Sequence, residues 1–360
     1  MKALIAMSGG VDSSTAAYLM QQSGYACAGC TMKLYTNEDA GLSRSEEGSA
    51  GKTCCSLDDT EDARSVAFRL GMPFYVFNYT DEFRCRIIRE FAETYLRGET
   101  PNPCISCNRF MKFGALLERA RVLGCDTLAT GHYARVRFDG TKYRLLKGLD
   151  AAKDQSYVLY CLTQEQLAHI AFPLGELTKE TVRGIAEAQG FLNARKRESQ
   201  DICFVPDGDY ARIVEQVSGE TPPPGDFVSL EGRVLGRHKG IIHYTIGQRK
   251  GLGLSLPAPL YVCRIDAEKN QVVLGPHEAL FSDTVQVRNV NWIGGEAPAG
   301  PIPVQAKLRY RQPPAEALAV PQEDGSLLLC FKTPQRAVTP GQAAVLYDGD
   351  EVLGGGTIVL

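Results

Sequence analysis

The sequence lacks any apolar run that approaches the roughly 20 residues needed to cross a bilayer. The apolar segment at its start, residues 1–7, leads directly into Ser8-Gly9-Gly10 and is too brief for the hydrophobic region of a signal peptide. We therefore expect a cytoplasmic protein with no membrane partner. Because that compartment keeps thiols reduced, the twelve cysteines are not expected to form disulfides and are left for reactive, metal-binding or core roles.

Neither part of the chain has an excess of basic residues. Lys and Arg number 25 against 25 acidic residues up to residue 205, and 14 against 17 beyond it. Any RNA must therefore be held by local clusters, and DNA is not expected as a partner. The clusters are 195–197, 233–239, 249–250 and 307–311, and in the last of them positions 307, 309 and 311 would share one face of a strand.

Composition changes close to residue 205. Ten of the twelve cysteines precede residue 206, and fifteen of the nineteen prolines follow residue 205. Before this point apolar runs alternate with helical patterns, which predicts an α/β domain whose parallel sheet is covered by helices on both faces. After it, short β-like runs divided by Gly, Pro and Asp turns predict small, barrel-like β domains. We expect domains at 1–205, 206–283 and 284–360.

The expected elements can be placed by their patterns. In the first part, strands are expected at 2–7, 25–34, 74–78 and 127–130, and helices from 12, at 58–70 and from 81. In the second part, a helix at 209–217 precedes β runs at 227–230, 261–265, 271–274, 304–310, 327–331 and 343–347.

The segment Ser8-Gly9-Gly10-Val11-Asp12-Ser13-Ser14 lies between an expected strand and an expected helix. Glycines there allow the backbone to approach a pyrophosphate, while helix amides and serine hydroxyls donate to its oxygens. The spacing fits neither a P-loop nor a dinucleotide fingerprint. It resembles the pyrophosphatase loop of N-type ATP enzymes, which cleave ATP between the α and β phosphates, and Asp12 then suits a Mg2+-facing role. The alternative is a Gly-rich turn in which Asp12 is an ordinary helix cap.

Two cysteines stand three positions apart in Pro101-Asn102-Pro103-Cys104-Ile105-Ser106-Cys107-Asn108, a loop leading into a helix expected at Phe110. A helix N-terminus favours the thiolate, so Cys107 is predicted to be reactive. A third candidate, Cys203, lies 96 positions further on, at the expected domain boundary, where clefts form.

Matching segments run along almost the whole chain and resemble the bacterial tRNA-specific 2-thiouridylases, which are tRNA-uridine 2-sulfurtransferases. They are residues 7–13, 53–56, 100–108, 129–135, 153–157, 201–204 and 247–253. The resemblance implies a transferase that replaces a carbonyl oxygen of the wobble uridine by sulfur, in tRNAs for Lys, Glu and Gln. Adenylation suits this chemistry, because an oxygen converted to an AMP ester can leave while sulfur attacks the carbon.

The resemblance also implies roles for single residues. ATP would be bound by Ala6, Met7, Ser8, Gly9, Gly10, Val11, Asp12, Ser13, Met32 and Gly131. The target base would lie against Asn102, Pro103 and Cys104, and further tRNA contacts would come from His132, Lys153, Asp154, Gln155, Arg309, Tyr310 and Gln342. Cys203 would receive a persulfide sulfur from a cysteine desulfurase or sulfur-relay protein. Cys107 would then close a disulfide with Cys203 as the sulfur leaves.

Position 104 departs from a familiar form of the family, in which an Asp serves as a proton-transfer group. A thiol with a reference pKa of about 8.5 cannot simply inherit that role. The replacement creates three thiols, Cys104, Cys107 and Cys203, which could instead hold a 4Fe-4S cluster with one iron open to hydrosulfide. Persulfide chemistry without metal uses the same residues, so both interpretations stay open.

Two other functions compete with this interpretation. Another adenylating enzyme with the same loop, such as an amidotransferase-type synthetase or a tRNA lysidine synthetase, would use ammonia or an amine and would not need the cysteines. A non-catalytic tRNA-binding protein would use ATP only structurally.

Overall fold

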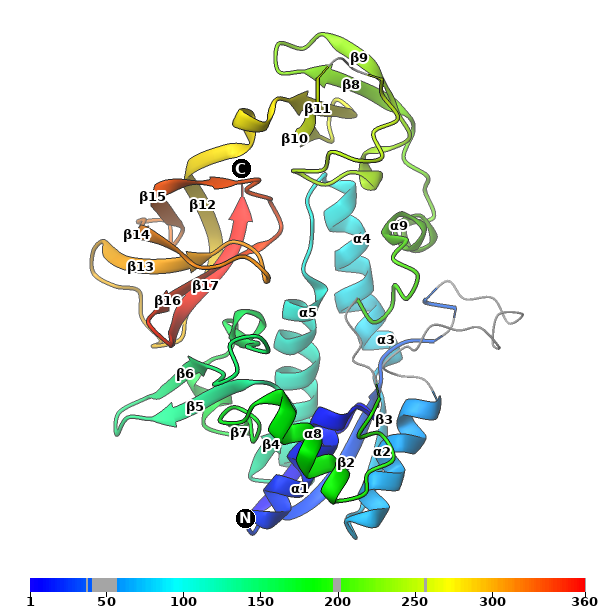
Figure 1. The fold of residues 1–360 in the computed structure, drawn as a ribbon, viewed down its shortest axis with the longest axis vertical. Helices are drawn as coiled ribbons and strands as arrows, with labels where there is room; N and C mark the ends of the chain where they lie inside the picture. The colour runs from blue at the N-terminus through cyan, green and yellow to red at the C-terminus, as the bar shows by residue number, and fades with distance from the viewer. Residues whose placement is uncertain (37, 41–56, 197–201, 256–257, 360) are drawn as a thin grey trace.

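The computed structural model describes residues 1–36, 38–40, 57–196, 202–255 and 258–359 (Figure 1). The motif at 53–56, Arg197 and Asp201 therefore lie outside the described residues. Within them, no helix is long and apolar enough to span a membrane.

A five-stranded parallel sheet forms the first domain, in the order β3-β2-β1-β4-β7. Its strands are β1 (Lys2–Ala6), β2 (Ala26–Lys33), β3 (Phe74–Asn78), β4 (Thr127–Ala129) and β7 (Ile170–Ala171). Leu4 belongs to one apolar core, while its neighbours Ala3 and Ile5 belong to another. Both faces of the sheet are thus buried, which explains the unbroken apolar run of β1.

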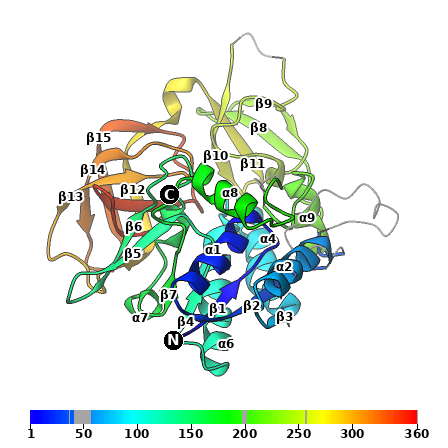
Figure 2. The ribbon, with the colours of Figure 1, turned by 60° about the horizontal axis from the view of Figure 1, so that its bottom comes forward.

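Helices cover the two faces. One face carries α1 (Val11–Gln22), α2 (Leu57–Arg69) and α8 (Lys179–Ala188), which Figure 2 shows in front of the sheet. The other carries two long helices with π-type turns in their middle parts. The first runs through α3 (Thr80–Phe83), η2 (Arg84–Ile88) and α4 (Arg89–Leu96), and the second through α5 (Pro103–Ser106), η3 (Cys107–Leu116) and α6 (Leu117–Val122). The predicted α/β domain is confirmed.

Cys27 and Cys30 follow the same alternation. Cys30 is buried in the core that contains Leu4, and Cys27 packs against the opposite core. The two cysteines thus lie on opposite faces of the sheet, since side chains alternate along β2.

The second domain is built on helix α9 and a four-stranded sheet. Helix α9 (Tyr210–Ser218) begins after Asp209, whose carboxylate accepts from the Arg212 amide. The sheet has the order β10-β11-β8-β9, with β8 (Gly225–Ser229), β9 (Val234–His238), β10 (Tyr261–Asp266) and β11 (Gln271–Gly275). A short 3-10 turn, η5 (Ile241–His243), packs with α9 against α4.

The third domain is a closed six-stranded barrel, because the first strand of the sheet β12-β15-β14-β13-β16-β17 also pairs with the last. The strands are β12 (Phe281–Trp292), β13 (Ile302–Lys307), β14 (Ala315–Pro321), β15 (Leu327–Arg336), β16 (Ala343–Asp348) and β17 (Glu351–Val359); η6 (His277–Leu280) precedes them. In Figure 1 the parallel sheet and the β8–β11 sheet lie at opposite ends of the molecule, and the barrel lies to one side of α4.

The barrel is joined to the first domain by hydrogen bonding between strands. A hairpin of the first domain, β5 (Ala134–Phe138) and β6 (Tyr143–Lys147), continues the barrel sheet through the pairing of Leu146 with Glu351. The Lys147 amide also donates to the Asp350 carbonyl. After β6, the chain forms η4 (Ser156–Leu159) and α7 (Gln164–Leu167) before entering β7.

The prediction of a basic face on a strand at 304–310 is wrong. Strand β13 ends at Lys307, and the chain then turns, with the Gln312 amide donating to the Arg309 carbonyl. Pro313 and Pro314 follow at once, and prolines cannot donate to a strand ladder. Lys307, Arg309 and Arg311 therefore do not form a stripe along one strand.

Candidate active site

A cleft of about 430 Å³ opens at the carboxyl ends of β1 and β4. These strands are neighbours in the sheet, but the chain leaves β1 toward β2 on one side and reaches β4 on the other. Ligands of open α/β sheets bind at such a reversal of strand order. The lining includes Ala6, Met7, Ser8, Gly10, Val11, Asp12, Ser13, Met32, Pro103, Cys104, Cys107, Lys112, Gly131, His132, Gln155, Lys196 and Cys203.

The glycine-rich loop between β1 and α1 is held by its own serines. Both the Ser13 and the Ser14 hydroxyl donate to the Gly10 carbonyl, at 3.0 and 3.1 Å, and the Ser8 amide donates to Ser13 Oγ at 3.1 Å. The expectation that these hydroxyls point their protons at a phosphate therefore differs from the structure, where they fix the loop. The amides of the first turn of α1 remain as the natural anion donors, because such amides have no partner within a helix.

Buried Asn193 fixes the same loop from outside. Its Nδ2 donates to the Gly9 carbonyl and to Ser14 Oγ, both at 2.9 Å. No sequence motif points to Asn193, since it lies some 180 positions away from the loop and in no recognised motif.

Two glycines allow the walls of the cleft to meet. A Cβ at Gly131 would lie 2.9 Å from the Asp12 carbonyl carbon and from the Ser13 nitrogen. A Cβ at Gly9, where φ is +72°, would lie 2.2 Å from the Asp59 carbonyl oxygen. The segment after β4, the loop before α1 and the first turn of α2 are therefore in backbone contact, which only glycine permits.

The carboxylates that line the cleft are paired with lysines. Lys179 donates to both oxygens of Asp12 at 2.7 and 2.8 Å, and the Tyr133 hydroxyl donates to Asp12 Oδ1 at 2.7 Å. Lys196 in turn binds Asp59 and Asp62. Burial opposes the charge of Lys196, but the hydrogen bonds of these two carboxylates outweigh it and raise its pKa.

This pairing bears on the Mg2+-facing role expected for Asp12. A second cation at that carboxylate would lie beside an ammonium only 2.7 Å from the same oxygen. The arrangement therefore does not fit a Mg2+ site built by Asp12.

Three thiols reach the cleft, from Cys104, Cys107 and Cys203. The helix begins at Pro103, a residue suited to a first helical position, so Cys104 lies in the first turn and is exposed. Cys107 lies a full turn later and is buried. The prediction that Cys107 occupies the helix N-terminus is therefore wrong. The Tyr35 hydroxyl donates to the Cys203 carbonyl at 2.6 Å and holds that segment against the first domain.

Lys112 and His132 form a further polar pair in the cleft. Lys112 Nζ lies 3.5 Å from His132 Nε2, and Thr130 Oγ1 lies 2.7 Å from His132 Nδ1. Burial, and then the positive charge of Lys112, hold the pKa of His132 well below its ordinary range. His132 is thus neutral at pH 7 and accepts from Lys112, for which the described residues supply no carboxylate partner. The sequence motifs missed Lys112, although it lies five positions after Cys107.

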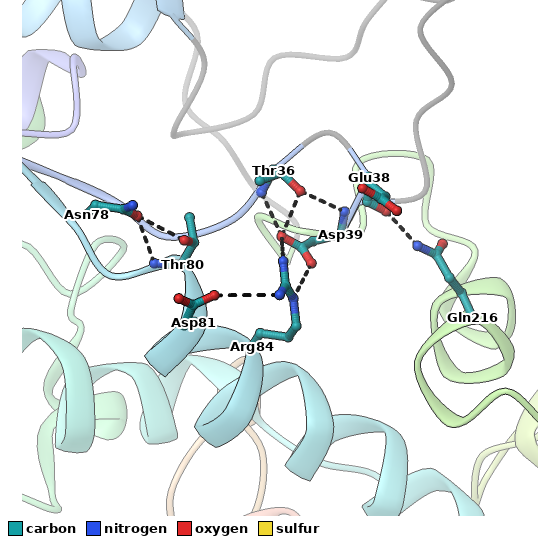
Figure 3. Close-up of polar contacts among 8 residues, drawn as sticks. All are labelled: Thr36, Glu38, Asp39, Asn78, Thr80, Asp81, Arg84 and Gln216. Carbon is teal, nitrogen blue, oxygen red and sulfur yellow. Dashed lines mark hydrogen bonds and ion pairs between the residues drawn. The ribbon is translucent and has the colours of Figure 1, made fainter.

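The segment that follows β2 is clamped to the helix forming another wall of the cleft (Figure 3). Arg84 Nε and Nη2 donate to the two oxygens of Asp39 at 2.7 and 3.2 Å. Burial acts to raise the pKa of Asp39, but the hydrogen bonds from Arg84 and Thr36 lower it overall. On the other side Gln216 of α9 donates to the Glu38 carbonyl. These contacts join β2, η2 and the second domain beside the cleft.

Several residues expected to touch tRNA lie outside the cleft and connect parts of the protein. Asp154 accepts from the amides of Gly148 and Ser156, and the Asp154 carbonyl accepts from the Tyr310 hydroxyl. Arg309 Nη2 donates to the carbonyls of Ile246 and Ala337 and to Thr339 Oγ1. Asn102, Lys153 and Gln342 also lie outside the cleft lining, whereas His132 and Gln155 are part of it.

Comparison with known proteins accounts for this architecture. Family models match three successive parts of the chain: the tRNA methyl transferase HUP domain at 1–207, the tRNA methyl transferase PRC-barrel domain at 212–276 and the aminomethyltransferase beta-barrel domain at 282–358. The protein is therefore a HUP-domain protein that carries two β domains, with its cleft in the HUP domain.

Curated relatives narrow this class. The chain is 48% identical over 359 residues to the tRNA-specific 2-thiouridylase MnmA of Acetivibrio thermocellus, which covers 99% of both chains. It is 49% identical over 358 residues to that of Geotalea uraniireducens, covering 99% of this chain and 94% of the relative. The chain belongs to the tRNA-specific 2-thiouridylase family, as its motifs predicted.

Proposed function

We propose that this protein is an ATP-dependent tRNA-uridine 2-sulfurtransferase that adenylates the uridine carbonyl and delivers sulfur from Cys203. The observation that carries the proposal is that one cleft is lined both by the glycine-rich loop, through Ser8 and residues 10–13, and by three thiols. Methyl transfer, the chemistry in the names of the family models, does not call for a pyrophosphate-binding loop beside the thiols. The names of the relatives, which specify 2-thiouridylation, agree with the cleft.

The first step activates the base. The O2 atom of the uridine attacks the α-phosphate of ATP, and pyrophosphate leaves with the electron pair of the bond that breaks. The amides at the start of α1 would bind the departing phosphates. Lys112 is placed to neutralise negative charge developing within the cleft, where the low dielectric strengthens its effect. No step is assigned to Mg2+, which would come with the nucleotide.

Sulfur transfer then uses two of the thiols. The terminal sulfur of a Cys203 persulfide attacks C2, and AMP leaves with the former carbonyl oxygen. The Cys107 thiolate next attacks the Cys203 sulfur, so that an S–S bond joins the two cysteines and 2-thiouridine is released. A reductant must open that disulfide, and a cysteine desulfurase or sulfur-relay protein must supply the next persulfide sulfur.

A 4Fe-4S cluster on Cys104, Cys107 and Cys203 is the alternative sulfur carrier. In such a cluster each thiolate would bind a different iron, so the same three cysteines serve either carrier. Iron analysis after anaerobic purification distinguishes the two: full activity in iron-free protein would support the persulfide, and activity that depends on four irons per chain would establish the cluster instead.

The substrate we propose is the wobble uridine of tRNAs for Lys, Glu and Gln. The base must leave its stack to reach a cleft at the end of the sheet, so we expect a flipped nucleotide. The barrel lies beside α4 and the β8–β11 sheet lies beyond one end of that helix (Figure 1), and we expect these two β domains to contact the anticodon arm. Sequence selection among tRNAs would then depend on contacts beyond the cleft.

Mass spectrometry of tRNA incubated with ATP and a persulfide donor tests the proposed reaction. A sulfur-for-oxygen mass gain on the wobble base is expected for the wild type, and none for Cys107→Ser or Cys203→Ser. The matched control is Cys85→Ser, because Cys85 is exposed on η2 and does not line the cleft. An adenylating enzyme that uses an amine would keep its turnover in all three variants, and a non-catalytic binding protein would release no pyrophosphate.

A further inference from the structure

The barrel touches the loop that carries the reactive cysteines. Gln342 Nε2, just before β16, donates to the carbonyls of Thr100 and Pro101 at 2.9 and 3.2 Å. In the reverse direction the Thr100 amide donates to the Pro340 carbonyl at 2.9 Å. A Cβ at Gly341, where φ is +85°, would lie 2.9 to 3.1 Å from backbone atoms of Thr100, so the two chains are in direct backbone contact. The contacted residues, Thr100 and Pro101, lie four and three positions before Cys104.

A second connection reaches the far side of the same cysteine pair. The Tyr157 hydroxyl of η4 donates to the Ala343 carbonyl at 2.8 Å, and Tyr157 is fully buried. One residue further, the Val158 carbonyl accepts from Nδ2 of buried Asn108 at 2.9 Å. Asn108 directly follows Cys107. The segment from 100 to 108 is thus attached at both ends to residues 340–343 of the barrel, once directly and once through η4.

The hydrogen bonds of Gln342 occupy its side-chain amide and the backbone carbonyls of Thr100 and Pro101. The Gln342 side chain donates two hydrogen bonds to backbone carbonyls inside the protein, and its amide nitrogen has only two protons to donate. Thr100 and Pro101 lie in an irregular turn, where neither helix nor strand satisfies the carbonyls. A turn of this kind takes its shape from such external partners.

We propose that Gln342 is a positioning residue, through which the C-terminal barrel sets the place of Cys104 and Cys107 relative to the nucleotide loop. The inference rests on the proposed function only in that tRNA thiolation is the activity expected to fall when Gln342 is replaced. The hydrogen bonds connect the barrel to the cysteine turn whatever reaction the thiols perform. Loss of Gln342 should therefore loosen the turn without weakening tRNA binding.

The test compares Gln342→Met with Gln322→Met. Methionine keeps the length and approximate volume of Gln but donates no hydrogen bond. Gln322 is the matched control, because it is exposed at the β14–β15 turn of the same barrel and its side chain donates to the nearby Val320 carbonyl. Hydrogen exchange of the 100–106 amides, alkylation of Cys104 by iodoacetamide, and steady-state thiolation are measured for both variants.

In Gln342→Met we expect exchange in the 100–106 segment to rise about tenfold, from the loss of two hydrogen bonds. The rate at which iodoacetamide alkylates Cys104 should change together with the exchange rate. For thiolation, kcat should fall about tenfold, and KM for tRNA should stay within about twofold of the wild-type value. Gln322→Met should match the wild type in all measurements. Unchanged exchange in Gln342→Met would overturn the inference. A raised KM for tRNA with an unchanged kcat would also overturn it, and would identify Gln342 as a direct tRNA contact.

Two further measurements separate other causes of failure. A melting temperature of Gln342→Met within a few degrees of the wild type is expected, and a global loss of stability with uniformly faster exchange would refute a local positioning role. If the wild type proved unable to thiolate tRNA, the proposed function would fail, while the exchange and alkylation results would still decide the role of Gln342.

Discussion

The contact between Gly131 and the nucleotide loop can be tested by adding one methyl group. In Gly131→Ala the new Cβ would lie 2.9 Å from the Asp12 carbonyl carbon and the Ser13 nitrogen, where ordinary contacts begin at 3.4 Å. Both neighbours are backbone atoms, so no rotamer change can relieve the overlap. The first turn of α1 must therefore move by about 0.5 Å, at a cost of about 1–3 kcal/mol as in other overpacked sites.

Most of that cost should appear in nucleotide binding, because the displaced amides are the proposed phosphate donors. A loss of 1–3 kcal/mol corresponds to a Kd for a non-hydrolysable ATP analogue raised about 5- to 150-fold. Isothermal titration calorimetry measures this Kd, and a thermal melt of the same sample measures stability. Gly184→Ala in α8 is the matched control, since Gly184 is exposed and a Cβ there meets nothing within 4 Å; the change should stabilise the helix by up to about 1 kcal/mol.

The reasoning would be refuted if Gly131→Ala bound the analogue as tightly as the wild type. It would also be refuted if Gly184→Ala weakened binding equally, because the effect could not then come from the contact with α1. A large fall in melting temperature with unchanged affinity would place the cost in folding and would contradict the proposed phosphate site.

Three other perturbations follow from the charges around the cleft. Arg84→Met should destabilise the fold by about 1–3 kcal/mol, because the buried carboxylate of Asp39 loses charged hydrogen bonds; an unchanged urea midpoint would contradict this. The pKa of His132 is lowered in the folded protein, so its contribution to the free energy of unfolding is full above about pH 6.5 and falls as the pH drops toward the folded pKa, by at most about 1.4 kcal/mol per pH unit. His132→Gln should flatten this part of the plot of unfolding free energy against pH. An identical plot for the variant would contradict the view that His132 is buried and neutral. Lys179→Met should weaken binding of Mg2+-free ATP about tenfold, because Asp12 would then face the phosphates without its ammonium; equal affinity in calorimetry would show that the pair has no influence on the anion site.

The elements that the sequence predicted well are those with a strong local pattern. Strand β3 at 74–78 was predicted to the residue, and β1, β2, β4 and α2 to within one or two residues. By contrast β17 was missed, because Gly354, Gly355 and Gly356 interrupt its apolar alternation. A Cβ at any of the three would lie 2.2 to 2.5 Å from a carbonyl oxygen of a neighbouring strand. Close packing between the barrel strands therefore requires glycine at these positions, and no local sequence pattern reveals that packing.

The candidate site divides in a similar way. Sequence motifs located the glycine-rich loop and the three cysteines, because these residues carry their chemistry within a few neighbouring positions. They did not locate Asn193, Lys179 or Lys112, whose roles depend on contacts with distant residues. Cys107 was also predicted at the start of a helix. The helix begins instead at Pro103, so the cysteine in its first turn is Cys104.

By itself, then, the sequence determined the α/β class of the first domain, the β character of the rest, the family and the chemical groups available for catalysis. These depend on hydrogen bonding and periodicity between near neighbours, which the order of residues fixes directly. Only the tertiary structure decided which groups meet: that Asp12 is paired with Lys179, that His132 is buried and neutral, and that Gln342 of the barrel holds the cysteine loop. The Asp12–Lys179 and Gln342–Thr100 contacts join residues more than a hundred positions apart. The geometry of all three follows from the packing of whole domains.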